Sequence, residues 1–359
     1  MTKLKRALIM AGGTGGHVYP GLAVALGLRE QAIEVHWLGT RQGLEAHVVP
    51  AANIPLHFIS IQGLRGKGWR ALLRAPWRFT VALVQAIHCI RTIRPDVVIG
   101  MGGFVSGPGG VASFLLGKKL IIHEQNAKPG LTNQWLAVLA RKVLEGFPNT
   151  FTQSRKVVTT GNPVRKEIAA LASPSTRSLS SGPLHLLVVG GSLGAQAINQ
   201  LLPQALATLP AAERPIVWHQ TGEKHYLETL NAYTALGVNA RIVPFITAMD
   251  QAYSWADMVL CRAGALTIAE LCAAGLGAIL VPYPHAVDDH QTANANFMVR
   301  KQAALVVQQA QLTKEMLASL LYDFYVSAEK RLQMATAAYQ LRRVDATESI
   351  LNICKEVCR

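Results

Sequence analysis

Two glycine-rich segments, each preceded by a short apolar run, have the composition of phosphate-binding loops. Residues 12–17 read GGTGGH after the apolar run 6–10, and residues 190–195 read GGSLGA after the run 184–189. Glycine lets backbone N–H groups approach an anion closely, and the N-terminus of a following helix adds positive potential. A tight turn is the alternative for one such segment, but two at corresponding positions favour contact with a phosphate or diphosphate.

A third segment places three different groups around the start of one predicted helix. The apolar run 258–261 is followed by Arg262, Ala263 and Gly264, and then by a helical pattern that carries Glu270. We expect the backbone amides and Arg262 to hold phosphate, and Glu270 to accept both ribose hydroxyl protons of a nucleoside diphosphate sugar. The alternative is that Glu270 only stabilises the first turns of the helix through its dipole.

The sequence disfavours three other kinds of phosphate or metal site. Neither glycine segment reads G-x-G-x-x-G, and the run that ends in Leu38-Gly39-Thr40 has no acid for an adenosine ribose, which disfavours dinucleotide binding. The pattern G-x-x-x-x-G-K-[ST] is absent, so nucleoside triphosphate hydrolysis has no support. A D-x-D motif is also missing, and the adjacent Asp288 and Asp289 predict a solvated acidic turn. We therefore expect no metal site.

Strand-like apolar runs alternate with longer helical segments in both halves of the chain. Besides the runs before the glycine segments, they occupy residues 34–38, 97–100, 120–123, 216–220, 258–261 and 278–281. This alternation predicts parallel sheets with crossover helices. The order of strand, glycine loop and helix restarts at residue 184, so the fold class is α/β with the same plan in each half.

Length and composition predict two domains. The chain has 359 residues, half of them hydrophobic, which exceeds the size at which one core usually divides. The segment 171–183 is rich in Ser, Pro and Gly, and we place the hinge within residues 161–181. We assign residues 1–163 to an N-terminal domain, 164–340 to a C-terminal domain, and 341–359 to a helix expected to pack back on the first domain. The five cysteines include no CxxC pair and fit reduced thiols in a cytosolic protein.

The excess positive charge is confined to the first part of the chain. The net charge is +14, and residues 1–165 hold 20 Lys and Arg against six Asp and Glu, whereas the remainder holds 15 of each. Residues 62–80 contain no acid, and their cations alternate with aromatic and leucine side chains at helix-like spacing. This pattern predicts docking on an anionic bilayer surface, with an amphipathic helix packed on its own sheet as the alternative. The predicted membrane patch comprises Arg65, Lys67, Trp69, Arg70, Leu73, Arg74, Trp77 and Arg78.

Other uses of the charge and of the apolar segments have less support. No nucleic-acid recognition motif accompanies the basic residues, so we expect no nucleic-acid partner. No secretory segment is predicted, because the apolar run after Arg6 is too short. The long uncharged stretches 97–117 and 271–287 are broken by Gly and Pro, which favours buried strands and loops over membrane spans. We expect the scattered histidines to be structural; they include His36, His47, His57 and His219.

Five motifs together resemble those of one enzyme family. They are GGTGGH at 12–17, HEQN at 123–126, GNPVR at 161–165, GGS-x-GA at 190–195 and CRAGALTIAE at 261–270. Over nearly its whole length the chain is similar to the bacterial peptidoglycan N-acetylglucosaminyltransferases. The resemblance implies a GT-B fold, with two Rossmann-like doubly wound parallel-sheet domains and an interdomain cleft. It also implies inverting transfer of GlcNAc from UDP-GlcNAc to the MurNAc O4 of lipid I, undecaprenyl-diphospho-MurNAc-pentapeptide, to give lipid II.

The same resemblance implies a setting for the reaction. It would take place at the cytoplasmic face of the bacterial inner membrane, with the protein bound peripherally to an anionic surface and other cell-wall synthesis proteins as partners. UDP-GlcNAc is a substrate, and no separate cofactor is expected.

Donor contacts are implied in both halves of the chain. The residues expected to bind UDP-GlcNAc are Thr14, Gly15, Gly16, Asn126, Arg165, Ser192, Phe245, Ile246, Arg262, Ala265, Leu266, Thr267, Ile268, Ala269, Glu270 and Gln291. Ile246 would offer its backbone to uracil. The sequence departs from the family at Leu193, where Gln is common, and at the segment 284–291, which contains an extra residue and leaves Gln291 to read the sugar hydroxyls.

Acceptor and catalytic residues are implied in the first half. The acceptor diphosphate is expected at the loop 102–110 and the first glycine segment, with contacts from Gly13, Gly102, Gly103, Ser106 and Gly107. Direct displacement at the anomeric carbon needs a base for the acceptor hydroxyl and a positive site for the departing UDP. His17 is the candidate base, with Glu124 in reserve. The alternative for His17 is a helix cap or a ligand hydrogen bond without proton exchange, and helix N-termini with Arg262 would stabilise UDP without metal.

Two further functions remain open at this point. Another GT-B enzyme, a glycolipid glycosyltransferase or a UDP-GlcNAc 2-epimerase, would share the donor pocket. The epimerase needs no membrane patch but needs several acids around the sugar, which the sequence does not show. A nucleotide-sugar-binding protein without activity would tolerate loss of His17, Arg165 and Glu270, yet all three are present.

Overall fold

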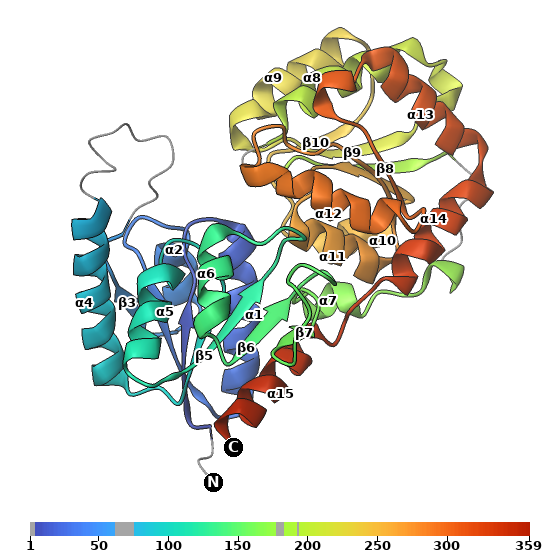
Figure 1. Cartoon of the computed structure of the whole chain (residues 1–359). Helices are drawn as coiled ribbons and strands as arrows, with labels where there is room; N and C mark the ends of the chain where they lie inside the picture. The colour runs from blue at the N-terminus through green and yellow to red at the C-terminus, as the bar shows by residue number, and fades with distance from the viewer. Residues whose placement is uncertain (1–3, 62–74, 177–182, 192–193) are drawn as a thin grey trace. The chain divides into compact units, whose positions relative to one another are not determined.

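The chain folds into two compact α/β units. The computed structural model describes residues 4–61, 75–176, 183–191 and 194–359, and at Val287 it describes the backbone alone. The first unit comprises residues 1–164 and 345–359, and the second comprises residues 165–344. Each unit has one parallel sheet with helices on both faces (Figure 1). The α/β prediction with parallel sheets is confirmed.

The sheet of the first unit has seven strands in the order β3-β2-β1-β4-β5-β6-β7, and all of its pairings are parallel. Its strands are β1 Arg6–Met10, β2 Glu34–Gly39, β3 Leu56–Phe58, β4 Val97–Gly100, β5 Lys119–Glu124, β6 Lys142–Glu145 and β7 Val157–Thr159. Its described helices are α1 Gly15–Glu30, α2 Glu45–Ala51, α4 Ala75–Ile93, α5 Ser106–Leu115, α6 Leu131–Leu139 and α15 Ala346–Cys358. The carboxyl ends of β1, β4 and β5 therefore meet at one edge of the sheet.

Alternating strand residues divide the first unit's core into two layers. Ala7 and Ile9 face the cluster formed with α1 and α15, whereas Leu8 and Met10 face the cluster formed with α4, α5 and α6. Helices α4, α5 and α6 lie side by side, and α1 lies beside α15. The C-terminal segment 345–359 thus belongs to the same unit as residues 1–164.

The sheet of the second unit repeats the plan with six parallel strands in the order β10-β9-β8-β11-β12-β13. Its strands are β8 His185–Val189, β9 Ile216–Gln220, β10 Arg241–Val243, β11 Met258–Cys261, β12 Gly277–Leu280 and β13 Ala304–Val306. Its helices are α7 Lys166–Ala169, α8 Gln196–Thr208, α9 Tyr226–Ala235, α10 Met249–Trp255, α11 Ala265–Ala274, α12 His290–Val299, α13 Lys314–Val326 and α14 Ala328–Gln340. The segments after β8 and β11 occupy places equivalent to those after β1 and β4.

Five strands of the structure were not among the predicted ones. They are β3, β6, β7, β10 and β13, each three or four residues long. Such short runs give too little alternation or length to be recognised, and β6 begins with Lys142 and ends with Glu145. Each forms because it pairs with a neighbouring strand, as β6 pairs with β5.

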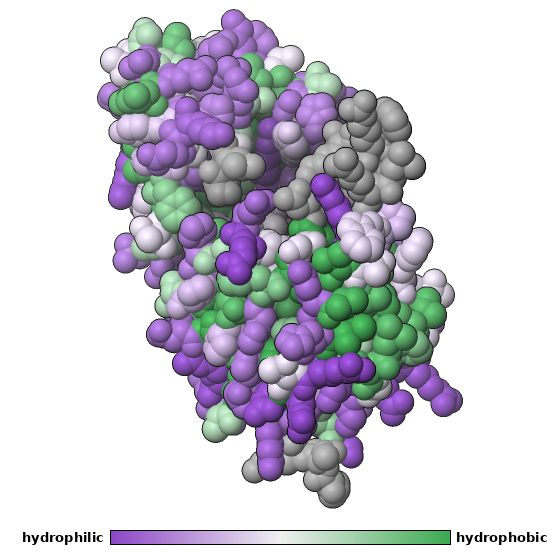
Figure 2. All heavy atoms as spheres, turned by 90° about the vertical axis from the view of Figure 1, so that its left-hand side faces the viewer, coloured by the Kyte–Doolittle hydropathy of each residue, from purple (hydrophilic) through white to green (hydrophobic). Residues whose placement is uncertain are grey.

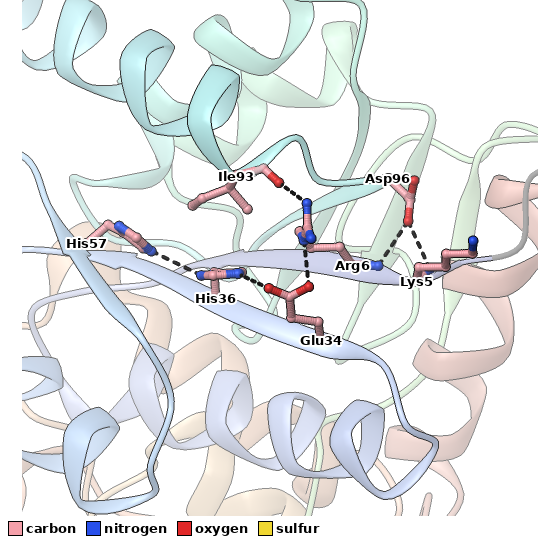
Figure 3. Close-up of polar contacts among 7 residues, drawn as sticks. All are labelled: Lys5, Arg6, Glu34, His36, His57, Ile93 and Asp96. Atoms are coloured by element: carbon pink, nitrogen blue, oxygen red, sulfur yellow. Dashed lines mark hydrogen bonds and ion pairs between the residues drawn. The ribbon is translucent and has the colours of Figure 1, made fainter.

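A polar cluster lies at the amino ends of strands in the first unit (Figure 3). Asp96, just before β4, accepts the backbone amide of Arg6 over 2.9 Å, and Arg6 Nε donates to Glu34 Oε2 over 2.7 Å. His36 contacts Glu34 Oε1 through Nε2 and His57 Nε2 through Nδ1, at 2.8 and 3.1 Å. Within the first unit this edge of the sheet is opposite the first glycine segment, and the cluster joins β1, β2 and β3 rather than forming part of that site.

The five cysteines all lie among the described residues, where they are buried and form no disulfide. Burial raises the pKa of Cys354 to about 12 and that of Cys89 to about 11, so both remain thiols. Among the described residues no group of His, Cys, Asp and Glu could hold a metal ion.

Candidate functional site

The first glycine segment lies at the carboxyl end of β1, where α1 begins. Gly13 has φ +93°, a conformation that L side chains rarely adopt, and a Cβ there would meet no atom within 4 Å. Thr14 is the residue before α1, and its side chain makes no capping hydrogen bond. The amides of Gly15 and Gly16 have no acceptor among the described residues, so the helix start has donors available for an anion.

A buried carboxylate, which was not predicted from the sequence, accepts a hydrogen bond from this segment. Glu45 is fully buried, and its Oε2 accepts the amide of Gly13 over 3.0 Å. Its Oε1 accepts the amide and the hydroxyl of Thr40 over 2.9 and 2.8 Å. A Cβ on Gly12 would lie 2.7 Å from Glu45 Oε1, so glycine at this position leaves room for the buried carboxylate.

The loop after β4 packs directly on the first glycine segment. Gly102 and Gly103 have φ values of +102° and +79°, and a Cβ on Gly103 would lie 2.3 Å from the carbonyl oxygen of Gly12. Ser106 is fully buried, and its hydroxyl accepts the Gly102 amide over 3.1 Å. That hydroxyl is within reach of the carbonyl oxygens of Gly102 and Met10, at 2.9 and 3.2 Å, so it holds the loop rather than facing outward. Gly107 lies in the first turn of α5, near Thr132 and Phe79.

His17 lies in the first turn of α1 and is connected to strand β5 by a series of hydrogen bonds. Its Nδ1 lies 2.9 Å from Oε1 of Gln125, and Nε2 of Gln125 lies 3.0 Å from Nδ1 of His123. The Nε2 of His123 donates to the carbonyl oxygen of Gly161 over 3.0 Å. His17 is partly exposed, whereas His123 and Gln125 are buried.

Glu124, the reserve candidate for the base, organises its own loop. It is 2% exposed, and its Oε1 accepts the backbone and side-chain amides of Asn126 over 3.0 and 3.2 Å. Its Oε2 accepts the amide of Gly130 over 3.1 Å and Asn133 Nδ2 over 2.9 Å. Both oxygens are therefore engaged within the protein, and Asn126 is held at the carboxyl end of β5.

The glycine segment of the second unit lies at the carboxyl end of β8. Gln220 is 3% exposed, and it accepts the Gly191 amide and donates to the Gly191 carbonyl, each over 3.0 Å. A Cβ on Gly194 would lie 2.3 Å from the carbonyl oxygen of Thr221. Ser192 and Leu193, which the sequence analysis singled out, lie outside the described residues.

Helix α11 begins at Ala265, shortly after β11 ends at Cys261, and its first backbone amides are available as hydrogen-bond donors. Gly264 precedes it without a side-chain cap, and the first amide with a helical acceptor is that of Ile268, which donates to Gly264. The amides of Ala265, Leu266 and Thr267 have no acceptor among the described residues. Ile268 is fully buried, so its side chain packs in the core, and Ala269 is the next residue of the helix.

Glu270 is held between two partners within the second unit. Its Oε1 accepts Nε and Nη2 of Arg165 over 3.1 and 2.8 Å, and its Oε2 accepts the hydroxyl of Tyr253 over 3.0 Å. The side chain of Glu270 is 16% exposed and that of Arg165 is 49% exposed. Burial, followed by the charge of Glu270, raises the pKa of Tyr253 well above its ordinary value. Neither the ion pair with Arg165 nor the contact with Tyr253 was predicted from the sequence.

Arg262 joins the ends of neighbouring strands in this structure. Its Nη1 donates to the carbonyl oxygens of Val281 and Pro282 over 3.1 and 3.2 Å, and its Nη2 donates to Oε1 of Gln309 over 2.6 Å. Its guanidinium carbon lies 5.5 Å from the ring centre of Tyr283. Burial lowers the pKa of Arg262, yet the group remains a cation at neutral pH.

The remaining predicted donor contacts lie in two loops of the second unit. Phe245 is exposed and Ile246 is buried, in the segment after β10. Gln291 lies in the first turn of α12, and its Oε1 accepts the amide of Tyr283 over 2.9 Å. Asp288 and Asp289 both have φ +53°, and Oδ1 of Asp289 accepts the Thr292 hydroxyl over 2.7 Å.

Exposed apolar side chains gather over α4, α5 and α6 of the first unit. We define this apolar surface as Trp77, Phe79, Phe114, Leu115, Leu131, Trp135 and Val138. Trp77 is 73% exposed and Trp135 is 78% exposed. The lower half of Figure 2 shows apolar atoms together on this side of the unit, with hydrophilic residues below them. Arg78 is exposed beside Trp77, whereas Arg65, Lys67, Trp69, Arg70, Leu73 and Arg74 lie outside the described residues.

The described helices contain none that is both long and apolar enough to cross a bilayer.

Comparison with known families finds a match in each unit. Residues 7–145 match the glycosyltransferase family 28 N-terminal domain, and residues 185–350 match the glycosyltransferase family 28 C-terminal domain.

Individual proteins are similar over nearly the whole chain. The UDP-N-acetylglucosamine–N-acetylmuramyl-(pentapeptide) pyrophosphoryl-undecaprenol N-acetylglucosamine transferase of Marinobacter nauticus is 55% identical over 353 residues, which cover 98% of this chain and 97% of that protein. The protein of the same name from Hahella chejuensis is 52% identical and covers 99% of this chain and 98% of its own length.

Solved structures show the same fold. The crystal structure of Acinetobacter baumannii MurG has a TM-score of 0.85 at 41% identity, with 98% of this chain and 99% of that chain covered. A UDP-N-acetylglucosamine 2-epimerase structure has a TM-score of 0.65 at 14% identity, with 98% and 95% covered, and so shares the fold alone.

Proposed function

The chain belongs to glycosyltransferase family 28, and from this premise we propose how its residues carry out the reaction. It is a UDP-GlcNAc-dependent N-acetylglucosaminyltransferase with the GT-B fold, and it forms lipid II in peptidoglycan synthesis. UDP-GlcNAc and lipid I are its substrates. The MurNAc O4 attacks the anomeric carbon of GlcNAc in one step, which inverts that centre.

The observation that carries the donor assignment is the uncapped start of α11 between Arg262 and Glu270. Free amides at residues 265–267 can donate to the diphosphate of UDP-GlcNAc, and the helix dipole favours its negative charge. Glu270 already accepts three hydrogen bonds, and a carboxylate offers about four acceptor positions, so it accepts both ribose hydroxyl protons once Arg165 has turned away. Arg165, half exposed, can turn its guanidinium from Glu270 toward a phosphate oxygen.

The rest of the donor pocket follows from neighbouring loops. The backbone of Ile246 reads uracil beside Phe245, and Gln291 reads hydroxyls of GlcNAc. In the first unit, Thr14, Gly15, Gly16 and Asn126 complete the donor contacts. Arg262 acts on the diphosphate mainly by its charge, because its two terminal nitrogens already donate hydrogen bonds to protein oxygens.

His17 is the base in this proposal. Nδ1 is bound to Gln125, and Nε2 has no partner among the described residues, so Nε2 can take the proton of the acceptor hydroxyl. Glu124 is a poorer candidate because both of its oxygens accept hydrogen bonds inside the loop. The departing UDP is stabilised by the amides of α11 and by Arg262, so the reaction proceeds without a metal.

The acceptor diphosphate binds at the paired glycine loops of the first unit. Amides of Gly103 and Gly107 are the proposed donors of these loops. The amides of Gly13 and Gly102 already donate to Glu45 and Ser106, so these two glycines shape the loops instead. The contribution of Ser106 is to fix the loop, because its hydroxyl is buried among backbone groups.

The apolar surface on α4 to α6 holds the enzyme at the anionic inner face of the bacterial inner membrane. Trp77 and Trp135 would enter the interfacial region, where aromatic rings are favoured. Exposed cations beside it in the chain, Arg78, Lys128 and Arg141, would meet lipid phosphates. The undecaprenyl chain of lipid I is embedded in the same membrane, so this contact brings the acceptor loops to their substrate. Cell-wall synthesis proteins are expected partners at that surface.

Transfer of labelled GlcNAc from UDP-GlcNAc to a short-chain lipid I analogue tests the proposal. We expect His17→Ala to lower kcat by about 10²- to 10⁴-fold, the usual contribution of a general base. Glu270→Ala should raise the KM for UDP-GlcNAc by roughly 10-fold or more, because a hydrogen bond to a charged group contributes about 1.5–3 kcal/mol. Glu329→Ala, an exposed carboxylate on α14, is the control and should match the wild type.

Two results would contradict the proposal. Wild-type enzyme that binds UDP-GlcNAc but transfers nothing to the lipid I analogue would point to another acceptor. Full activity of both His17→Ala and Glu270→Ala would show that these residues do not carry the reaction.

A further inference from the structure

A series of hydrogen bonds runs from His17 through Gln125 and His123 to Gly161. The Gly161 carbonyl fixes which atom donates and which accepts in each of these bonds. The carbonyl oxygen of Gly161 can only accept, so the Nε2 of His123, 3.0 Å away, has to carry a hydrogen. In a neutral imidazole the other nitrogen is then unprotonated. Nδ1 of His123 is therefore an acceptor.

The direction continues through Gln125. Because Nδ1 of His123 accepts, the group of Gln125 that lies 3.0 Å from it has to be the NH2 of the amide. The carbonyl Oε1 of Gln125 then faces Nδ1 of His17 at 2.9 Å, and an amide oxygen can only accept. Nδ1 of His17 consequently carries the hydrogen, and its Nε2 is left with the lone pair.

The environment of His123 keeps this direction in place. His123 is fully buried at the end of β5, and burial lowers its pKa in spite of the Gly161 carbonyl and the Glu124 carboxylate, which favour the cation. A doubly protonated His123 would need the Gln125 amide to turn over. At neutral pH the neutral form, and with it the orientation of Gln125, persists. The backbone of Gln125 is also held in position, because Asn162 Nδ2 donates to its carbonyl oxygen over 2.9 Å.

We propose that His123 and Gln125 are positioning residues that hold His17 in the tautomer protonated on Nδ1, with Nε2 ready to accept the proton of the acceptor hydroxyl. This inference rests on the proposed role of His17 as the base. When Nε2 takes the proton, the ring becomes a cation and keeps its bond from Nδ1–H to Gln125 Oε1, which is then charge-assisted. The same network thus orients the base before the transfer and stabilises it afterwards.

Gly102 fixes the ring from its side. A Cβ on Gly102 would lie 2.6 Å from Nδ1 and 2.8 Å from Cε1 of His17, so the ring lies against this glycine. The loop that follows β4 therefore restricts the tilt of the ring, while Gln125 restricts its tautomer.

The tautomer of His17 is measured by long-range ¹H–¹⁵N correlation on enzyme labelled with ¹⁵N-histidine at neutral pH. His17→Ala identifies the resonances by their loss. We expect a protonated Nδ1 and an unprotonated Nε2 in the wild type. A hydrogen on Nε2 instead would overturn the inference whatever the kinetics show.

Kinetics with a lipid I analogue test the consequence for catalysis. Gln125→Leu and His123→Leu should each lower kcat by about 10- to 100-fold, part of the contribution of a general base, and leave KM for UDP-GlcNAc within about threefold. His123→Asn keeps an acceptor oxygen near the position of Nδ1 and should recover kcat relative to His123→Leu. Gln200→Leu is the matched control, because Gln200 makes one side-chain bond on an exposed face of α8, and it should match the wild type.

The outcomes separate the inference from the proposed function. If His17→Ala loses kcat while Gln125→Leu and both His123 variants keep it, the positioning role is wrong and the base stands. If His17→Ala keeps full kcat, the base itself is wrong, and the tautomer measurement still reports on the network. A rise in KM without a loss of kcat in Gln125→Leu would also overturn the positioning role.

Discussion

Tyr253 offers a sharp test of the donor site, because its hydroxyl donates to Glu270. The substitution Tyr253→Phe removes one oxygen atom and keeps the ring, which is 1% exposed. The hydroxyl donates to Glu270 Oε2 over 3.0 Å, and the raised pKa of Tyr253 keeps its hydrogen in place at neutral pH. In the variant, Glu270 remains paired with Arg165 through Oε1 but loses the partner that fixes Oε2.

The expected magnitude follows from the charge of the acceptor. A hydrogen bond to a charged group contributes about 1.5–3 kcal/mol, and about 1.4 kcal/mol corresponds to a factor of ten. The lower end of this range corresponds to about tenfold, so we expect the KM for UDP-GlcNAc to rise by about tenfold while kcat stays within about threefold. Initial rates at varied UDP-GlcNAc and saturating lipid I analogue give both constants.

The matched control is Tyr233→Phe in the same unit. Tyr233 is also 1% exposed, and its hydroxyl lies 3.0 Å from Nδ1 of His219. Both variants should lower the melting temperature by comparable amounts, but only Tyr253→Phe should change KM. Equal KM values for the two variants would refute the positioning of Glu270 by Tyr253.

Three further outcomes are expected. Activity should survive EDTA, because helix amides and Arg262 stabilise the departing diphosphate; complete loss that magnesium restores would contradict this. Trp135→Ser should weaken sedimentation with anionic vesicles at unchanged kcat on a soluble acceptor, since it removes an aromatic side chain that is 78% exposed; unchanged vesicle binding would remove the apolar surface from the membrane contact. The enzyme should lose stability as the pH falls below about 6.5, the ordinary value for histidine, because burial lowers the pKa of His219 to about 3 and the unfolded chain then binds more protons. Between pH 6.5 and 5 this amounts to about 2 kcal/mol, and His219→Asn should reduce the loss in urea unfolding at the two pH values.

The features that the sequence predicted well depend on local pattern. Strands β1, β4, β9 and β11 coincide with predicted apolar runs of four or five residues, and the two glycine segments follow β1 and β8. Helix α11 begins directly after Gly264, and a glycine has no side chain to cap the first amides of the helix, so these available donors are predictable from the sequence. The resemblance to a family with the GT-B fold added roles for individual residues, which the hydrophobic periodicity of the sequence does not indicate.

The features that the sequence did not predict depend on contacts between distant segments. Glu45 holds Gly13, which is 32 residues away, and Gln220 holds Gly191, which is 29 residues away. Arg165 meets Glu270 across 105 residues, although each was singled out on its own. Spacing along the chain carries no signal for such pairs, because the sheet order rather than the sequence order decides which loops become neighbours.

The return of α15 to the first unit has a consequence for how the protein is made. Buried Ile350, Leu351, Cys354 and Cys358 complete the core layer that α1 begins, although all seven strands of that unit precede residue 160. During synthesis the first unit therefore waits, with one apolar face of α1 uncovered, until residues 345–359 have left the ribosome. The second unit is continuous and can fold before the first is complete, so synthesis from the N-terminus does not finish the units in their order along the chain.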